Sequence, residues 1–210
     1  MRTRVKICGI TRTEDAQLVI DAGADAIGLV FYEKSPRFVN NEQAQEICQM
    51  VPAFVSCVAL FKDADERTIR TTLENVEIDL IQFHGSESAA FCEQFTLPYI
   101  KALGMKAEHC DANYLIANAK NYVMAKALLL DGHAPGDAGG TGETFDWSSI
   151  DDINKPVILA GGLTAVNVKQ AIEMVHPFAV DVSSGVESAP GVKDKSKIAE
   201  FMQQVNSSNK

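Results

Sequence analysis

Two short runs, far apart in the chain, each end in an ionisable residue followed by glycine. The first is Lys6-Ile7-Cys8-Gly9, and the second is Leu128-Leu129-Leu130-Asp131-Gly132. If both runs are strands of one parallel barrel, the Cys8 thiol and the Asp131 carboxyl face each other across its mouth. A thiol and a carboxyl on opposite sides of a bound molecule can act as a base and an acid.

Short apolar runs alternate with helix-like stretches along the whole chain. We predict strands at residues 4–8, 26–31, 54–61, 80–83, 99–102, 122–131, 157–160 and 178–182. Several are apolar at consecutive positions, which is typical of strands covered on both faces. Helical periodicity follows in residues 13–22, 42–51, 166–175 and 195–205, with Thr164 placed to cap the third of these helices.

Eight such repeats predict an α/β fold, a single (β/α)8 TIM barrel over residues 1–206, with a frayed polar tail at 207–210. A doubly wound open sheet is the alternative. No linker divides the chain, and the glycine-containing residues 133–143 are too short for a domain junction. We interpret that stretch as an active-site loop, the alternative being a disordered surface loop.

The composition limits the classes of partner. The 210 residues carry a formal net charge of −9, which argues against nucleic acid because its binding depends on neutralising phosphates with Lys and Arg. No apolar run approaches the roughly 20 residues that span a bilayer, and the N-terminus lacks a signal-peptide pattern. We therefore expect a cytoplasmic protein, a monomer or homodimer, that binds a small molecule rather than nucleic acid or membrane.

The five cysteines are odd in number and none has C-x-x-C spacing. A disulfide framework or a zinc site is therefore improbable, and we predict no metal. The four cysteines other than Cys8 are expected to be reduced, buried, small hydrophobic residues: Cys48, Cys57, Cys92 and Cys110.

Two glycine-containing runs follow the last two predicted strands. Residues 159–163 include Gly161 and Gly162, and residues 182–186 include Ser183, Ser184 and Gly185. Barrels often bind phosphate at the loops after strands seven and eight, where backbone amides at a helix start supply donors. Together the runs predict a phosphate site.

Five single residues have both a functional and a structural interpretation. Cys8 is a base if a cation or helix N-terminus lowers its pKa, or else a buried strand cysteine; Asp131 is an acid or a turn cap. Arg37 offers a fork for a carboxylate, or is a solvated loop residue. His84 lines a pocket or satisfies a carbonyl, and Asp181 faces the mouth or pairs with a buried charge.

The ordered motifs resemble the phosphoribosylanthranilate isomerase family of tryptophan biosynthesis. The resemblance starts with Lys6-Ile7-Cys8-Gly9-Ile10 and Ser35-Pro36-Arg37-Phe38-Val39 and spans nearly the whole chain. The other matching runs are residues 28–31, 82–85, 129–131, 139–142, 145–147, 159–163, 167–168, 181–187 and 190–194.

The resemblance implies an Amadori rearrangement of an anthranilate aminoaldose without cofactor or metal. It implies that Cys8 is the general base, that Asp131 is the general acid and that Arg37 holds the anthranilate carboxylate, with His84 and Asp181 nearby. The implied phosphate donors are Gly161, Gly162, Ser183, Ser184 and Gly185, with Gly140 and Thr141 closing over the phosphate. Phe31 is expected to line the aromatic pocket or to pack in the core.

Two other functions fit parts of this pattern. A different phosphosugar isomerase or epimerase would be expected to use two carboxylates or metal-binding histidines, and of the four histidines His84 has a strand-end position. A non-catalytic barrel that binds a phospholigand would keep both glycine-containing loops but would not need both Cys8 and Asp131.

Overall fold

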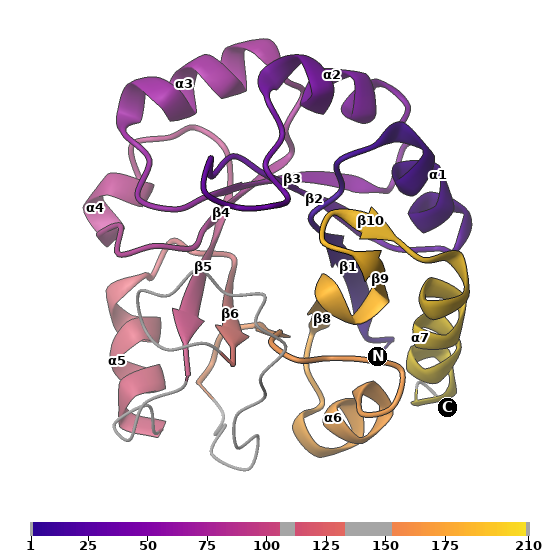
Figure 1. Cartoon of the computed structure of the whole chain (residues 1–210). Coiled ribbons are helices and arrows are strands. Elements are labelled where there is room, and N and C mark those ends of the chain that lie inside the picture. Colours follow the sequence, from indigo (N-terminus) through magenta and orange to yellow (C-terminus); the bar gives the residue numbers. More distant parts are fainter. Residues whose placement is uncertain (1, 106–111, 133–152, 209–210) are drawn as a thin grey trace.

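A computed structural model describes residues 2–105, 112–132 and 153–208. Strands β1 to β8 form a closed parallel barrel in sequence order, because β1 pairs with both β2 and β8. Figure 1 shows the helices outside this ring of strands. The closed ring confirms the predicted (β/α)8 architecture and excludes the open sheet, in which the first and last strands would not pair.

The elements alternate along the chain as the hydrophobic pattern predicts. The barrel strands are β1 (Arg4–Cys8), β2 (Ala26–Val30), β3 (Ser56–Phe61), β4 (Leu80–Phe83), β5 (Tyr99–Gly104), β6 (Ala127–Asp131), β7 (Val157–Leu159) and β8 (Ala179–Val182). The described helices are α1 (Thr13–Asp21), α2 (Asn41–Gln49), α3 (Glu66–Asn75), α4 (Ala89–Cys92), α5 (Ala112–Asn121), α6 (Val168–Val175) and α7 (Lys195–Ser208). A short 3-10 helix, η2 (Ser184–Val186), and an antiparallel hairpin of β9 (Glu187–Ala189) and β10 (Val192–Lys193) lie between β8 and α7.

Two predicted strands begin too early. The third was expected from residue 54, but Phe54 has φ of 73°, outside the extended region. The sixth was expected from residue 122, but the Tyr122 amide still donates to Asn118 O at 2.9 Å and closes the end of α5. The apolar residues of the preceding turns therefore made both predicted strands longer than the observed ones.

The last two helices also differ from the prediction. Thr164 does not cap α6, because the helix begins at Val168 and Thr164 lies in the preceding turn. There the Asn167 side chain accepts from the Thr164 amide at 2.8 Å and donates to Gly162 O at 3.0 Å. Helix α7 continues to Ser208, past the expected domain end at residue 206.

The barrel interior carries both apolar and polar side chains. Ile100, Leu129 and Ile158 belong to one buried apolar cluster on β5, β6 and β7, whereas β1 and β8 contribute the buried Lys6 and Asp181. Successive strand residues point to opposite faces, so the residues two positions further along these strands point into the mouth. The register of the barrel thus places the polar side chains near its carboxyl end.

Two further expectations concern burial and membrane contact. Cys48, Cys57 and Cys92 are buried as predicted, and Cys110 lies outside the described residues. Within the described part of the chain, no helix is long and apolar enough to cross a bilayer.

Candidate active site

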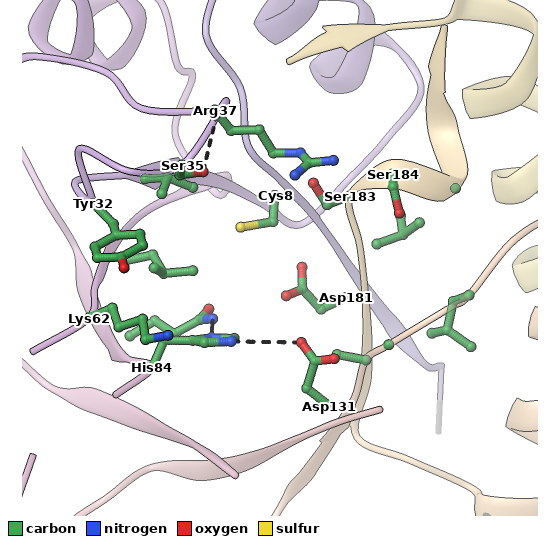
Figure 2. Close-up of a pocket in the computed structure, with 18 of the residues that line it drawn as sticks. Cys8, Tyr32, Ser35, Arg37, Lys62, His84, Asp131, Asp181, Ser183 and Ser184 are labelled. Atoms are coloured by element: carbon green, nitrogen blue, oxygen red, sulfur yellow. Dashed lines mark hydrogen bonds and ion pairs between the residues drawn. The ribbon is translucent and has the colours of Figure 1, made fainter. Parts of the chain in front are cut away.

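One cavity opens at the carboxyl ends of the barrel strands (Figure 2). It is lined by every predicted site residue that the structure describes: Cys8, Arg37, His84, Asp131, Gly161, Gly162, Asp181, Ser183, Ser184 and Gly185. The two other predicted phosphate residues, Gly140 and Thr141, lie outside the described residues. Residues from both ends of the chain meet here because each follows, or ends, a strand of the same closed barrel.

Cys8 and Asp131 lie on opposite sides of the cavity, with Asp181 between them in the view of Figure 2. Both residues end their strands, β1 and β6, and both are buried. Gly28 on β2 faces the thiol: a Cβ at this position would lie 2.6 Å from Cys8 Sγ. Glycine therefore leaves the space that the sulfur occupies, and any larger residue would displace it.

The charges around Cys8 oppose one another. Burial raises the pKa of the Cys8 thiol above its ordinary value, although the positive charges of Lys6 and Lys193 act against this rise. The negative charge of Asp181 adds to the rise. The cations that would activate the thiol are present, but burial outweighs them, so the surroundings favour the neutral thiol.

A buried ion pair lies next to Cys8 in the barrel. Lys6 pairs in register with Asp181 on β8, and Lys6 Nζ lies 2.9 Å from Asp181 Oδ2. Burial raises the pKa of Asp181 even though Lys6 favours its ionised form. Its second oxygen, Oδ1, is buried and has no hydrogen-bond partner in the described chain. The structural interpretation of Asp181, a partner for a buried charge, and the functional one, a group facing the mouth, are therefore both realised.

His84 lies between Gln82 and Asp131. Gln82 Nε2 is 3.0 Å from His84 Nδ1, and His84 Nε2 is 3.8 Å from Asp131 Oδ2 (Figure 2). If the Gln82 amide donates to Nδ1, the proton of a neutral imidazole sits on Nε2. His84 then directs an N–H towards the carboxyl that is the candidate acid.

Arg37 has a partner that the sequence did not predict. Its Nε and Nη2 donate to the two carboxylate oxygens of Glu187 at 2.9 and 2.8 Å. Lys193 Nζ donates to Glu187 Oε1 at 2.7 Å. Arg37 is therefore not the solvated loop residue of the alternative interpretation: its side chain is 13% exposed, and one edge of its guanidinium binds the carboxylate of Glu187.

The two predicted phosphate loops are neighbours. Residues 161–163 follow β7 and residues 183–185 follow β8, and the two strands pair directly. Asn167 holds the first loop in shape through its bonds to Gly162 and Thr164. The loops therefore form one wall of the cavity, and Figure 2 shows Ser183 and Ser184 of the second loop there.

Comparisons with known proteins agree with this geometry. The family profile described as "N-(5'phosphoribosyl)anthranilate (PRA) isomerase" matches residues 5–204. The chain belongs to this isomerase family. The N-(5'-phosphoribosyl)anthranilate isomerase of Pseudomonas fluorescens (strain SBW25) is 52% identical over 207 residues, 98% of this chain and 97% of the relative.

Solved structures of the isomerase family have the same fold. Phosphoribosyl anthranilate isomerase from Thermotoga maritima has a TM-score of 0.88 and 38% identity, with 98% of this chain and 99% of that chain covered. Another structure of the isomerase, with a TM-score of 0.85, 37% identity and the same coverage, is a complex with reduced 1-(O-carboxyphenylamino)-1-deoxyribulose 5-phosphate.

The aromatic wall of this isomerase-family cavity is not formed by Phe31. That side chain packs in the core, where its ring stacks on Phe61 at 5.3 Å between centroids. Tyr32, one residue later, lines the cavity instead, and Lys62 Nζ lies 5.4 Å from the centre of its ring. A shift of one residue moves a side chain to the other face of an extended chain.

Several residues of the isomerase-family site were not predicted from the sequence. They are Lys6, Tyr32, Lys62, Gln82, Glu187 and Lys193. Strand alternation could have found Lys6 and Gln82, because each lies two positions before a predicted site residue on the same strand. Glu187 and Lys193 fall in runs that match the family, but no local pattern shows which charge pairs with which. Within residues 2–105, 112–132 and 153–208, no group of three or more His, Cys, Asp or Glu side chains is placed to hold a metal ion.

Proposed function

We propose that this chain converts N-(5'-phosphoribosyl)anthranilate to 1-(2-carboxyphenylamino)-1-deoxyribulose 5-phosphate, an isomerisation of tryptophan biosynthesis. The observation that carries the proposal is one cavity that joins a thiol, a carboxyl across from it and two loops at adjacent strand ends. Membership of the isomerase family and the ligand named for a solved relative support it.

The reaction needs an acid and a base in turn. Asp131 gives its proton to the furanose ring oxygen, the bond from that oxygen to C1 breaks, and the nitrogen lone pair forms a cationic imine. With the imine cation in the cavity the Cys8 thiol loses its proton to solvent, the thiolate removes the proton from C2, and the electrons of that C–H bond move towards the imine to give an enolamine. Tautomerisation of the enolamine gives the aminoketose. Each positioned proton transfer contributes about 10²- to 10⁴-fold.

The raised pKa of Cys8 fits this order of steps. Burial raises the pKa of the thiol, so the thiolate has to be favoured after the substrate enters. The imine cation supplies a positive charge in the cavity, and a nearby positive charge favours the ionised thiol. Ring opening by Asp131 thus prepares Cys8 for its own step.

The remaining residues bind the two ends of the substrate. We assign the phosphate to Gly161, Gly162, Ser183, Ser184 and Gly185, together with Gly140 and Thr141 from outside the described residues. Arg37 takes the anthranilate carboxylate through donors that Glu187 leaves unused. His84 lies next to the acid, and Asp181 Oδ1 is an acceptor for a sugar hydroxyl. Binding at the phosphate end orients the reacting carbons.

A fluorescence assay of the purified chain tests the proposal, because consumption of the anthranilate aminoaldose changes the signal. Cys8→Ser and Asp131→Asn should each lower kcat by at least about 10²-fold, while inhibition by inorganic phosphate stays as in the parent protein. That inhibition shows that each variant is folded with an intact anion loop. A near-normal rate in either variant would remove that residue from its role, and the same assay with a chelator tests the expectation that no metal is needed.

Two further expectations remain predictions. We expect a monomer or a homodimer, which light scattering after size-exclusion chromatography distinguishes, and we expect the protein in the cytoplasm. Monomers of the dimeric Thermotoga maritima isomerase are among the solved relatives.

A further inference from the structure

The hairpin of β9 and β10 brings a carboxylate and an ammonium to Arg37. Glu187 begins β9, Lys193 ends β10, and Figure 1 shows the hairpin beside β1. Glu187 and Lys193 are buried, and the Arg37 side chain is 13% exposed. The bonds from Arg37 to Glu187 therefore form where water competes little, and they fix the plane of the guanidinium.

We propose that Glu187 is a positioning residue that orients Arg37 for a ligand carboxylate and so makes the cavity selective for carboxylate-bearing ligands. This inference rests on the function proposed above. Glu187 uses the Nε and Nη2 edge of the guanidinium. The five N–H donors of arginine include two on Nη1 and a second on Nη2. Those donors form another fork, and among the described residues Nη1 has no hydrogen-bond partner.

Arg37, Glu187 and Lys193 form a cluster with a net charge of one positive unit. Lys193 Nζ has three acceptors, Glu187 Oε1, Cys8 O at 2.6 Å and Ser183 O at 3.3 Å, which matches the three donors of an ammonium. Hydrogen bonds from Arg37 and the charge of Lys193 outweigh burial and lower the pKa of Glu187. Two cations therefore surround one carboxylate, and a ligand carboxylate completes the neutralisation.

The stem of Arg37 is fixed as well as its head. A Cβ on Gly9, which has φ of 76°, would lie 2.4 Å from Arg37 Cδ, so the stem passes directly over this glycine. The Arg37 amide donates to Ser35 Oγ at 3.1 Å. With the backbone, the stem and one guanidinium edge all held, the free edge has a defined direction at the cavity wall.

The test compares two ligands that differ in a single group. The first is reduced 1-(o-carboxyphenylamino)-1-deoxyribulose 5-phosphate, and the second is the same compound without the carboxylate. Glu187→Asp keeps the charge but shortens the side chain by one methylene and breaks the bidentate contact. We expect its Kd for the first ligand to rise about tenfold, in line with the loss of one charged hydrogen bond. The Kd for the second should stay within about twofold.

A double-mutant cycle separates positioning from a structural role. In an Arg37→Ala background, Glu187→Asp should cause no further loss of affinity, because it acts through the arginine. In the assay, KM should rise while kcat stays close to that of the parent. Glu87→Asp is the matched control, since Glu87 is also buried and paired with a buried lysine but accepts from backbone amides instead of from Arg37; it should leave both affinities unchanged.

Different results would overturn the positioning role of Glu187 and the carboxylate site at Arg37. Equal loss for both ligands, or an undiminished loss in the Arg37→Ala background, would overturn the positioning role of Glu187. If Arg37→Ala alone binds both ligands like the parent, the carboxylate site assigned under the proposed function is wrong. Should Glu187→Asp fail to fold, Glu187→Gln provides the same test, because glutamine keeps the length of the side chain but has one acceptor oxygen and no charge for the Nε and Nη2 edge of Arg37. It should lose affinity for the carboxylate ligand selectively, and equal losses would again overturn the inference.

Discussion

Two buried Lys–Glu pairs lie near the carboxyl ends of the strands, and they have different surroundings. Lys101 Nζ lies 3.0 Å from Glu87 Oε2, and Lys193 Nζ lies 2.7 Å from Glu187 Oε1. Each ammonium also donates to backbone carbonyls, for example to Gly85 O and to Cys8 O. By distance and burial alone, the two pairs would be assigned the same role.

The two carboxylates differ in the partners that they have besides the lysine. Glu87 also accepts from the backbone amides of Asp63 and Gly85, which are neutral, so one cation balances one anion. Glu187 instead accepts from Arg37, a second cation at the cavity. The pair of Lys101 and Glu87 has no net charge and connects loops. The cluster of Arg37, Glu187 and Lys193 has a net positive charge that an anionic ligand can neutralise. A buried ion pair thus indicates binding when its charges do not cancel.

The largest effect should come from removing the cation of the balanced pair. Lys101→Met leaves the Glu87 carboxylate buried without a counter-charge, and we expect the free energy of unfolding to fall by about 3–5 kcal/mol. Lys193→Met should cost less, because Arg37 still pairs with Glu187. Urea denaturation of the two variants gives both values, and equal losses would contradict the distinction between the pairs.

The next effect concerns geometry on the cavity side. Gly28→Ala places a methyl group where Cys8 Sγ now lies, since the Cβ would be 2.6 Å from it. A displacement of about 1 Å can cost about 10²-fold in rate, so we expect kcat to fall by that order. Affinity for the reduced carboxyphenylamino ligand should change less than about threefold, because its binding groups are untouched. A kcat like that of the parent would show that the sulfur has room to move.

The smallest effect is a shift in the reactivity of Cys8 with pH. Because burial raises the pKa of this thiol, its alkylation by iodoacetamide should rise with pH only above the ordinary range of a thiol, since the thiolate is the reacting form. Lys193 favours the thiolate, so Lys193→Met should move the midpoint to a still higher pH. Mass spectrometry of the Cys8 peptide measures the midpoint.

Lys101→Met is the control for that measurement. The charge of Lys101 is balanced by Glu87, so its removal should leave the midpoint unchanged. A shift of the same size in both lysine variants would mean that global loosening, rather than local charge, controls the thiol.

Residues that end a strand could be predicted from the sequence, and residues that pair across the barrel could not. Cys8 and Asp131 end short strands and His84 directly follows one, so local hydrophobicity located them and barrel closure brought them together. Arg37 and Glu187 are 150 residues apart, and Lys6 and Asp181 are 175 apart. Their pairing depends on which strands are neighbours and on the register between them. The hydrophobic periodicity of a single segment gives no information on either.

The same limit explains the exchange of Phe31 for Tyr32. Both aromatic residues follow β2, and hydrophobicity favours either as a pocket wall. The orientation at the end of the strand decides, and there Phe31 turns to Phe61 in the core. A prediction of the face therefore needs the exact end of the strand, which is the least determined property of a sequence-based assignment.

The unpaired oxygen of Asp181 bears on how the protein tolerates heat. A buried acceptor without a partner costs about 1–3 kcal/mol, and a buried ion pair such as Lys6 with Asp181 can often be replaced by apolar side chains without loss. Selection for thermal robustness alone would favour that replacement. A barrel that keeps both charges beside its thiol is therefore less stable to unfolding than one with an apolar interior. A ligand that donates a hydrogen bond to the free oxygen of Asp181 should raise the free energy of unfolding again.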